Sequence, residues 1–279
     1  MKLKIVLAAS ALIAFSAAFA GCGAKNNAEI PENQLQTVIP EEPAEIPEER
    51  IESPEISLPE EIPEPPEIKK ASYIKVTGDS VNIRSGAGTS YSVSGTAEKS
   101  TLYTCLGEEN GWYKTKYKNR TVYISKQYCT KVELETDDNE LIERVISEGC
   151  KLLGVPYVYG AVRLHDGKGN MLKGFSENAF DCSSLMQYIF YKGAGKLLDV
   201  NTRTQIYQGT TISKSNLKRG DLIFFTNDSR KNNKGIERVG HVALYLGDNY
   251  ILHTASDYAK IEQISSKRWS YYIQAQRII

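Results

Sequence analysis

The 279-residue sequence predicts an α+β domain preceded by a small all-β barrel. Short alternating runs separated by turn residues fill residues 73–131, a pattern typical of a small barrel. Apolar residues then recur at helical spacing over 141–153 and over 185–190. Three runs of strand length follow, at 222–225, 241–246 and 250–253. Helices and strands therefore share the second domain.

The amino-terminal segment predicts export. Lys2 and Lys4 precede an apolar run over 5–20, which is shorter than the roughly 20 residues a membrane-spanning helix needs. The run ends in Phe19-Ala20-Gly21-Cys22, which resembles the lipobox of bacterial lipoproteins, although Phe19 stands where Leu is usual. We therefore expect residues 1–21 to be a lipoprotein signal peptide and Cys22 to carry the lipid anchor. Ordinary secretion with a spare cysteine is the alternative.

Residues 22–70 predict an extended linker. Nine of the ten prolines lie between Pro31 and Pro66, and residues 23–70 hold thirteen Glu against four basic residues, a net charge of −9. Such a segment has no apolar face and repels itself, so we expect a disordered or polyproline-rich tether. The first 22 residues contribute +2 to a total of zero, which leaves +7 for residues 71–279. This small excess of positive charge is compatible with binding to anionic wall polymers. It is far smaller than the positive charge of a typical nucleic-acid-binding surface.

The predicted barrel, residues 71–131, contains three characteristic strings: VNIRSGAGTSY, GWYK and VYISKQY. They resemble the bacterial SH3 domain (SH3b), a frequent companion of wall hydrolases. The resemblance implies a domain that binds wall peptide or glycan, or that shapes a neighbouring active site. A structural spacer with Trp112 in its core is the alternative. Cys105 and Cys129 lie in this segment, and pairing and free thiols both remain open.

A helix start and a hairpin suggest a reactive cysteine. Asp181 fits the N-cap position of a helix that Gly193 would end, which places Cys182 in the first turn. Unsatisfied N–H groups and the helix dipole favour a thiolate there. His241 and His253 lie on two predicted strands and share a face only if the loop has an odd number of residues. A three-residue loop would satisfy this condition.

Five further strings lie within residues 132–279: PYVYGA, FDCSSLMQY, RGDLIFF, GHVALYLGD and YILHTA. They resemble the NlpC-type family of cell-wall cysteine peptidases, which have a papain-like α+β fold with an antiparallel sheet packed against helices. The resemblance implies that Cys182 is the nucleophile, His241 the general base and His253 the group that orients His241. Tyr157 matches the tyrosine of the oxyanion site. No metal or cofactor is implied.

The resemblance also implies a substrate. Family members generally cut the bond between γ-D-glutamate and the diamino acid of the peptidoglycan stem peptide. Asp181 and Ser183 match residues that bind a free stem amine in relatives, although Asp181 is equally explained as a helix cap. Arg203 and Thr204 lie where relatives place further substrate contacts.

One departure from the family is an insertion. Twenty-one residues, 161–181, separate Gly160 from Cys182, about twice the usual number. We expect the insertion to overhang the cleft and to narrow substrate choice. His165 within it is interpreted as part of a surface loop, because a metal site with Asp166 has little support.

The expected protein is thus an extracytoplasmic, membrane-anchored lipoprotein of the bacterial cell envelope, monomeric, acting on stem peptides and not on nucleic acid. Two other enzyme classes remain open: a papain-like N-acetylmuramoyl-L-alanine amidase and an acyl-transfer relative that acts on lipids. A non-catalytic wall-binding lipoprotein is the alternative from another class. The complete Cys182, His241 and His253 set favours an active peptidase.

Overall fold

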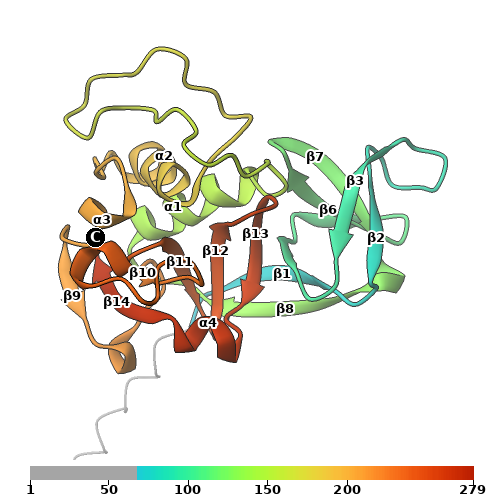
Figure 1. The fold of residues 1–279 in the computed structure, drawn as a ribbon. Coiled ribbons are helices and arrows are strands. Elements are labelled where there is room, and N and C mark those ends of the chain that lie inside the picture. Colours follow the sequence, from blue (N-terminus) through green and yellow to red (C-terminus); the bar gives the residue numbers. More distant parts are fainter. Residues whose placement is uncertain (1–67) are drawn as a thin grey trace, which may run out of the picture. The chain divides into compact units, whose positions relative to one another are not determined.

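The computed structural model describes residues 68–279 (Figure 1). The predicted signal peptide, the lipidation site Cys22 and nearly all of the predicted linker lie outside the described residues. Within the described part, no helix combines the length and the apolar character needed to cross a membrane.

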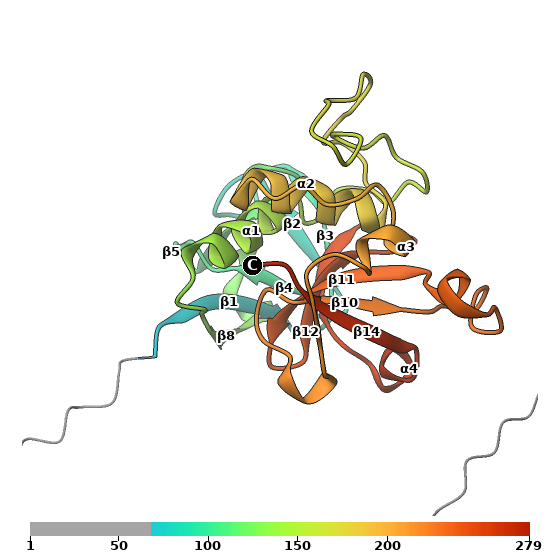
Figure 2. The same cartoon turned by 90° about the vertical axis from the view of Figure 1, so that its left-hand side faces the viewer.

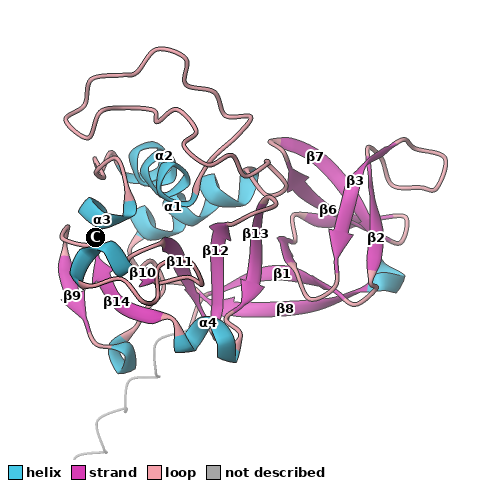
Figure 3. Ribbon diagram, in the orientation of Figure 1, coloured by secondary structure: helices cyan, strands magenta, loops and turns pink. Residues whose placement is uncertain are grey.

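The described residues form fourteen strands, four α-helices and three 3₁₀ turns (Figure 3). The strands are β1 (Lys70–Val76), β2 (Ser80–Arg84), β3 (Val93–Glu98), β4 (Leu102–Thr104), β5 (Gly107–Glu109), β6 (Trp112–Tyr117), β7 (Arg120–Ser125), β8 (Cys129–Glu135), β9 (Thr210–Ile212), β10 (Leu222–Phe225), β11 (His241–Gly247), β12 (Tyr250–Thr254), β13 (Ala259–Gln263) and β14 (Tyr272–Arg277). The helices are α1 (Glu140–Lys151), α2 (Cys182–Ala194), α3 (Thr202–Gln205) and α4 (Ser266–Ser270), and the 3₁₀ turns are Lys126–Tyr128, Lys214–Asn216 and Gly235–Arg238.

The amino-terminal strands form the expected small β structure. Five of them make an antiparallel sheet in the order β3-β2-β7-β6-β5. Its inner face follows from strict alternation, as in β6, where Tyr113, Thr115 and Tyr117 are buried. The remaining strands, β1, β4 and β8, belong to a nine-stranded sheet with order β8-β1-β4-β13-β12-β11-β10-β14-β9. One sheet therefore runs from the barrel strands into the α+β part.

Helices α1 and α2 pack on one face of the sheet at β11 and β12 (Figures 1 and 2). This arrangement of helices on an antiparallel sheet confirms the α+β prediction. The predicted helix end at Gly193 is wrong, because α2 continues to Ala194 and ends at Gly195, whose φ of 65° is left-handed. Gly193 instead allows close packing of the two helices, since a Cβ there would lie 2.5 Å from the backbone of Val145 in α1.

Contacts from the barrel support the carboxyl end of α1. The Lys118 N–H donates to the Leu153 carbonyl (2.8 Å), and the Asn119 N–H donates to the Lys151 carbonyl (2.6 Å). Gly154 is pressed against the ring of Tyr117, where a Cβ would lie 2.0 Å from the nearest ring atom. The turn between β6 and β7 therefore fixes the segment that leads from α1 toward Tyr157.

Candidate active site

Cys182 occupies the first turn of α2. Asp181 is the N-cap and forms a capping box with Ser184: Asp181 Oδ1 accepts from the Ser184 N–H (2.8 Å), and Ser184 Oγ accepts from the Asp181 N–H (2.9 Å). The backbone before the helix is extended, with φ −94° and ψ 174° at Asp181. The box therefore sets the direction in which the chain enters α2 and the position of the Cys182 side chain.

His241 and His253 meet across the β11–β12 hairpin. His241 Nε2 lies 3.0 Å from His253 Nδ1, and the two rings are nearly perpendicular at 78°. The predicted three-residue loop is not formed, since Gly247 pairs with Tyr250 across a two-residue turn. A bulge between Tyr245 and Gly247 adds the extra residue instead, so the two histidines still share a face.

Glu262 on β13 extends this pair, and sequence reasoning missed it. His253 Nε2 lies 3.0 Å from Glu262 Oε1, and Arg268 Nη2 donates to the same oxygen at 3.1 Å. Burial alone would raise the pKa of Glu262, but its hydrogen bond to His253 and the charges of His253 and Arg268 lower that pKa to about 2. The only available signal was the strand alternation that places Glu262 near His253, and this does not distinguish it from a solvated residue.

His241, His253 and Glu262 form a row of hydrogen-bonded side chains. The ionised Glu262 determines which ring nitrogens of the two histidines carry protons. A carboxylate can only accept, so His253 Nε2 must donate to it. In neutral His253, Nδ1 is then the acceptor, and His241 Nε2 donates to it. The remaining ring nitrogen of His241, Nδ1, is left without a proton. It is the atom of this row that can act as a base.

Burial keeps both Cys182 and His241 uncharged. Burial and the neighbouring Asp181 charge raise the pKa of the Cys182 thiol to about 12, against the lowering effect of backbone N–H groups. Burial, together with the charges of His253 and Arg268, holds the pKa of His241 well below its usual range. The N–H groups at the helix start thus favour the thiolate as predicted, but burial outweighs them and keeps the thiol protonated.

Two pockets meet at Cys182. The larger, about 670 Å³, includes His241, Asn227 and Arg268 in its lining. The smaller, about 240 Å³, includes in its lining Arg163 of the insertion, the starts of α2 and α3, and Arg230 from the segment between β10 and β11. Tyr157 and Cys182 line both pockets. Burial raises the pKa of Tyr157, so its hydroxyl keeps a proton to donate.

Comparison with known proteins agrees with this geometry. Residues 154–277 match the NlpC/P60 family, and residues 79–130 match the bacterial SH3 domain. The chain contains an NlpC/P60 domain. A bacterial SH3 domain precedes it, as the sequence strings predicted.

Three curated relatives are similar to part of this chain. The chain is 36% identical over 108 residues to the "Probable endopeptidase NlpC homolog" of Haemophilus influenzae, covering 38% of this chain and 53% of that protein. It is 31% identical over 136 residues to "Peptidoglycan endopeptidase RipA" of Mycolicibacterium smegmatis, covering 48% and 25%. It is 32% identical over 120 residues to "Gamma-D-glutamyl-L-lysine dipeptidyl-peptidase" of Bacillus cereus, covering 43% and 30%. The chain therefore spans about half the length of these relatives or less.

Three of the four residues predicted to bind substrate lie in one pocket. Asp181, Ser183 and Arg203 line the smaller pocket of the NlpC/P60 domain. Thr204 lines neither pocket, and its hydroxyl donates to the Asn201 carbonyl (3.1 Å) within the turn that starts α3. Thr202 takes a place in the pocket lining instead.

The insertion differs from the expected surface loop. His165 is fully buried, with its ring 5.4 Å from the ring of Tyr191 on α2, and its Nδ1 accepts from the Gly167 N–H (3.0 Å). The interpretation of His165 as a surface residue is therefore wrong, because the insertion packs part of its length on α2. The cysteines of the described residues, Cys105 and Cys129 included, are free thiols.

Proposed function

We propose that this protein is a peptidoglycan hydrolase, a cysteine endopeptidase that cleaves stem peptides at the bond between γ-D-glutamate and the diamino acid. The observation that carries the proposal is the position of Cys182 at a helix start, at the junction of two pockets, beside a histidine held by a second histidine. The relatives named as peptidoglycan endopeptidases and as a gamma-D-glutamyl-L-lysine dipeptidyl-peptidase support it. The same proposal divides the chain into a signal peptide (1–21), a linker (22–70), an SH3 domain (71–131) and a peptidase domain (132–279).

In the proposed reaction, the scissile carbonyl lies over Cys182. His241 Nδ1 takes the thiol proton, and the thiolate attacks the carbonyl carbon to form a C–S bond. The positive charge then resides on an imidazole whose Nε2–H donates to His253, which Glu262 holds in place. His253 and Glu262 therefore position His241 and stabilise its charged form.

The oxyanion of the tetrahedral intermediate accepts hydrogen bonds from the Tyr157 hydroxyl and the Cys182 N–H. One such donor lowers the barrier by about 3–4 kcal/mol. As the C–N bond breaks, His241 returns its proton to the departing amine of the diamino acid. Water then attacks the thioester with His241 as base, the C–S bond breaks, and the thiol regains its proton.

We also propose that Cys22 carries a lipid anchor and that a monomer acts outside the cytoplasm. The amino-terminal segment with its lipobox-like end supports this. The relatives named as peptidoglycan endopeptidases are consistent with action at the wall.

The SH3 domain is proposed to contact wall polymer. Trp112 is only half-buried and lines a pocket of about 830 Å³ with Arg84 and Tyr128. A half-exposed indole beside polar groups is a common surface for binding sugars or peptides. This observation disfavours the alternative in which Trp112 is simply a core residue.

A digest of purified peptidoglycan tests the proposed function. Glycan chains cut with a muramidase yield soluble muropeptides, whose products are followed by mass spectrometry with wild-type protein and with Cys182→Ala. We expect wild type alone to remove the diamino acid and everything beyond it. Release of whole stem peptides from the sugar would indicate an amidase instead. No product, with retained binding to the wall, would favour the non-catalytic alternative.

A further inference from the structure

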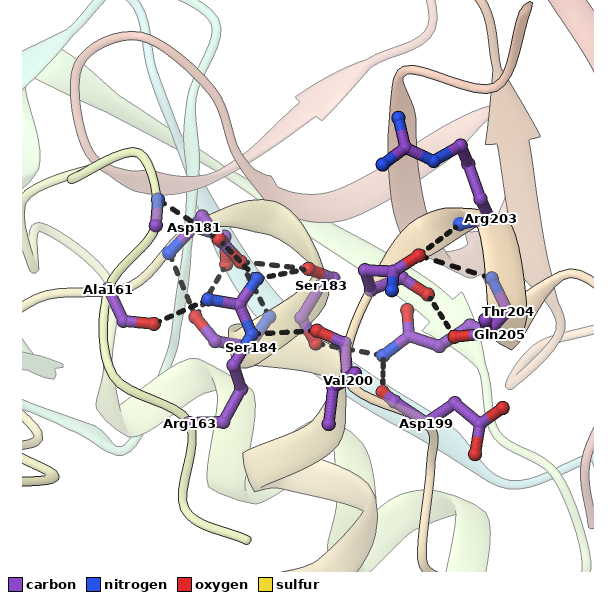
Figure 4. A network of polar contacts seen from close by, with 12 residues as sticks. Ala161, Arg163, Asp181, Ser183, Ser184, Asp199, Val200, Arg203, Thr204 and Gln205 are labelled. Carbon is purple, nitrogen blue, oxygen red and sulfur yellow. Dashed lines mark hydrogen bonds and ion pairs between the residues drawn. The ribbon is translucent and has the colours of Figure 1, made fainter. Parts of the chain in front are cut away.

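Arg163, which belongs to the insertion, reaches across the start of α2. Its Nε donates to the Val200 carbonyl (2.6 Å), and Nη1 donates to the Ala161 carbonyl (2.7 Å). Its Nη2 donates to Asp181 Oδ2 (2.8 Å) and lies 3.3 Å from Ser183 Oγ. Figure 4 shows the guanidinium enclosed by these groups. All three guanidinium nitrogens of Arg163 therefore donate hydrogen bonds, which fix its side chain in the pocket lining.

Asp181 has no acceptor position left for a ligand. Its Oδ1 accepts from the Ser184 N–H (2.8 Å) and from the Ser183 hydroxyl (2.9 Å). Its Oδ2 accepts from Arg163 and from the Gly160 N–H (3.3 Å). A carboxylate offers about four acceptor positions, and these four bonds use them. An ammonium group would have to displace the guanidinium of Arg163 to reach this carboxylate.

The smaller pocket is also positively charged. Arg163, Arg203 and Arg230 line it, and Asp181 is the one carboxylate in its lining. Arg203 and Arg230 both pair with Glu237, at 3.3 and 3.1 Å, and Glu237 itself does not line the pocket. An amino terminus placed here would therefore meet guanidinium groups and no free carboxylate.

The smaller pocket receives the acyl side of the substrate. His241 must protonate the departing amine, and His241 lines only the larger pocket. The leaving diamino acid therefore lies in the larger pocket. The residues on the amino-terminal side of the scissile bond extend into the smaller pocket, toward Arg163.

We propose that Arg163 determines specificity by closing the subsite for a free amine. The preferred substrate is then a stem peptide whose amino end is acylated, and not a peptide with a free amino terminus. The inference rests on the proposed function and replaces the expectation that Asp181 and Ser183 hold a free stem amine. The insertion would thus restrict the range of substrates through one arginine in the lining of the smaller pocket.

Three substrates that differ only at the amino end test the proposal on the full-length protein. They are L-alanyl-, N-acetyl-L-alanyl- and propionyl-γ-D-glutamyl-L-lysine, and the propionyl compound is the alanyl compound without its amine. Lysine release gives kcat/KM for each. We expect the acetyl and propionyl substrates to exceed the alanyl substrate by at least about tenfold, the effect of one charged hydrogen-bond partner. A wild-type preference for the free amine would overturn the inference and leave the proposed function standing.

Two variants assign the effect to Arg163. Arg163→Gln frees Asp181, so the ratio of kcat/KM for the alanyl to the acetyl substrate should rise about tenfold or more. Lys168→Gln removes one exposed positive charge from the same insertion and should leave the ratio unchanged. A folded Arg163→Gln protein with an unchanged ratio would contradict the role of Arg163.

The order of kcat/KM values of the wild-type protein for the three substrates tests the preference for an acylated amino end even if Arg163→Gln does not fold. Thermal melting of the variant identifies that outcome. Cleavage of none of the three substrates, nor of muropeptides, would overturn the proposed function and the inference with it.

Discussion

At the scale of single residues, the site depends on two buried histidines and a half-buried glutamate that are bonded to one another. His241, His253 and Glu262 form one row, and the charge at its far end decides which nitrogen of His241 carries a proton. Glu262 contacts His253 and lines neither pocket, so in the proposed reaction it acts through His253 and not on substrate.

Glu262→Gln should therefore lower kcat with little change in KM. The amide has no negative charge to stabilise an imidazolium, and its NH₂ group also permits the wrong tautomer of His253. Loss of one charged hydrogen bond predicts a decrease in kcat of about tenfold to hundredfold. Steady-state kinetics on a cleaved muropeptide measure it, with Glu133→Gln, an exposed carboxylate of β8, as control. An unchanged kcat would contradict a role for Glu262 in supporting His253 and His241.

The histidines also predict how stability depends on pH. Burial lowers the pKa of His165, His241 and His253 below the ordinary value. The unfolded chain therefore binds more protons than the folded one once the pH falls below about 6.5, and folding is weakened. Each histidine contributes a loss of up to about 1.4 kcal/mol per pH unit.

Urea unfolding between pH 7.5 and 5.5 measures this loss. We expect the free energy of unfolding to be greatest above pH 6.5 and to fall as the pH decreases through this range. Carboxyl groups remain ionised in both states over most of the interval, so they add little. His253→Gln should reduce the slope, and a flat profile in wild type would contradict the burial effect.

At the scale of elements, the start of α2 positions the thiol. The capping box joins Asp181 and Ser184, and Ser184 is fully buried. Ser184→Ala removes the hydroxyl bond to the Asp181 N–H and should destabilise the protein by about 1 kcal/mol. The melting temperature should fall by about 2–4 °C for a chain of this size.

The matched control for this change is Ser266→Ala, at the exposed first residue of α4. It should leave the melting temperature unchanged. If Ser184→Ala also left the melting temperature unchanged, the capping box would not stabilise the helix start.

At the scale of the whole described part, Arg219 joins three elements. It donates to Glu143 on α1 (2.6 and 2.8 Å), to the Leu246 carbonyl on β11 (2.8 Å) and to the Tyr73 hydroxyl on β1 (3.1 Å). The arginine of the RGDLIFF string is therefore structural and links the sheet, the first helix and the first barrel strand. Its side chain is 5% exposed, whereas that of its partner Glu143 is 28% exposed.

Arg219→Met should destabilise the protein by about 3–5 kcal/mol, because Glu143 would be left partly buried without its counter-charge. Denaturant unfolding measures the change. The double variant Arg219→Met/Glu143→Leu should recover part of the loss, since no unpaired charge then remains. A cost below about 1 kcal/mol for Arg219→Met would show that water replaces its contacts.

The sequence by itself determined the local features of this protein. The start of α2 at Cys182, the two strands that carry His241 and His253 and the alternating barrel strands follow from residues close together along the chain. Capping and strand alternation act over a few residues, so spacing is enough to predict them. The bulge that brings His241 and His253 to one face was not predicted.

Only the tertiary structure decided which side chains complete the site and how they are charged. Arg163 bonds the carbonyl of Val200, and Arg219 bonds the hydroxyl of Tyr73, across 37 and 146 residues of chain. The same holds for the burial of His165 and for the sheet that continues from Leu102 into Ile261. Hydrogen-bond partners and desolvation depend on what the fold brings close in space, and residue type and spacing do not determine that.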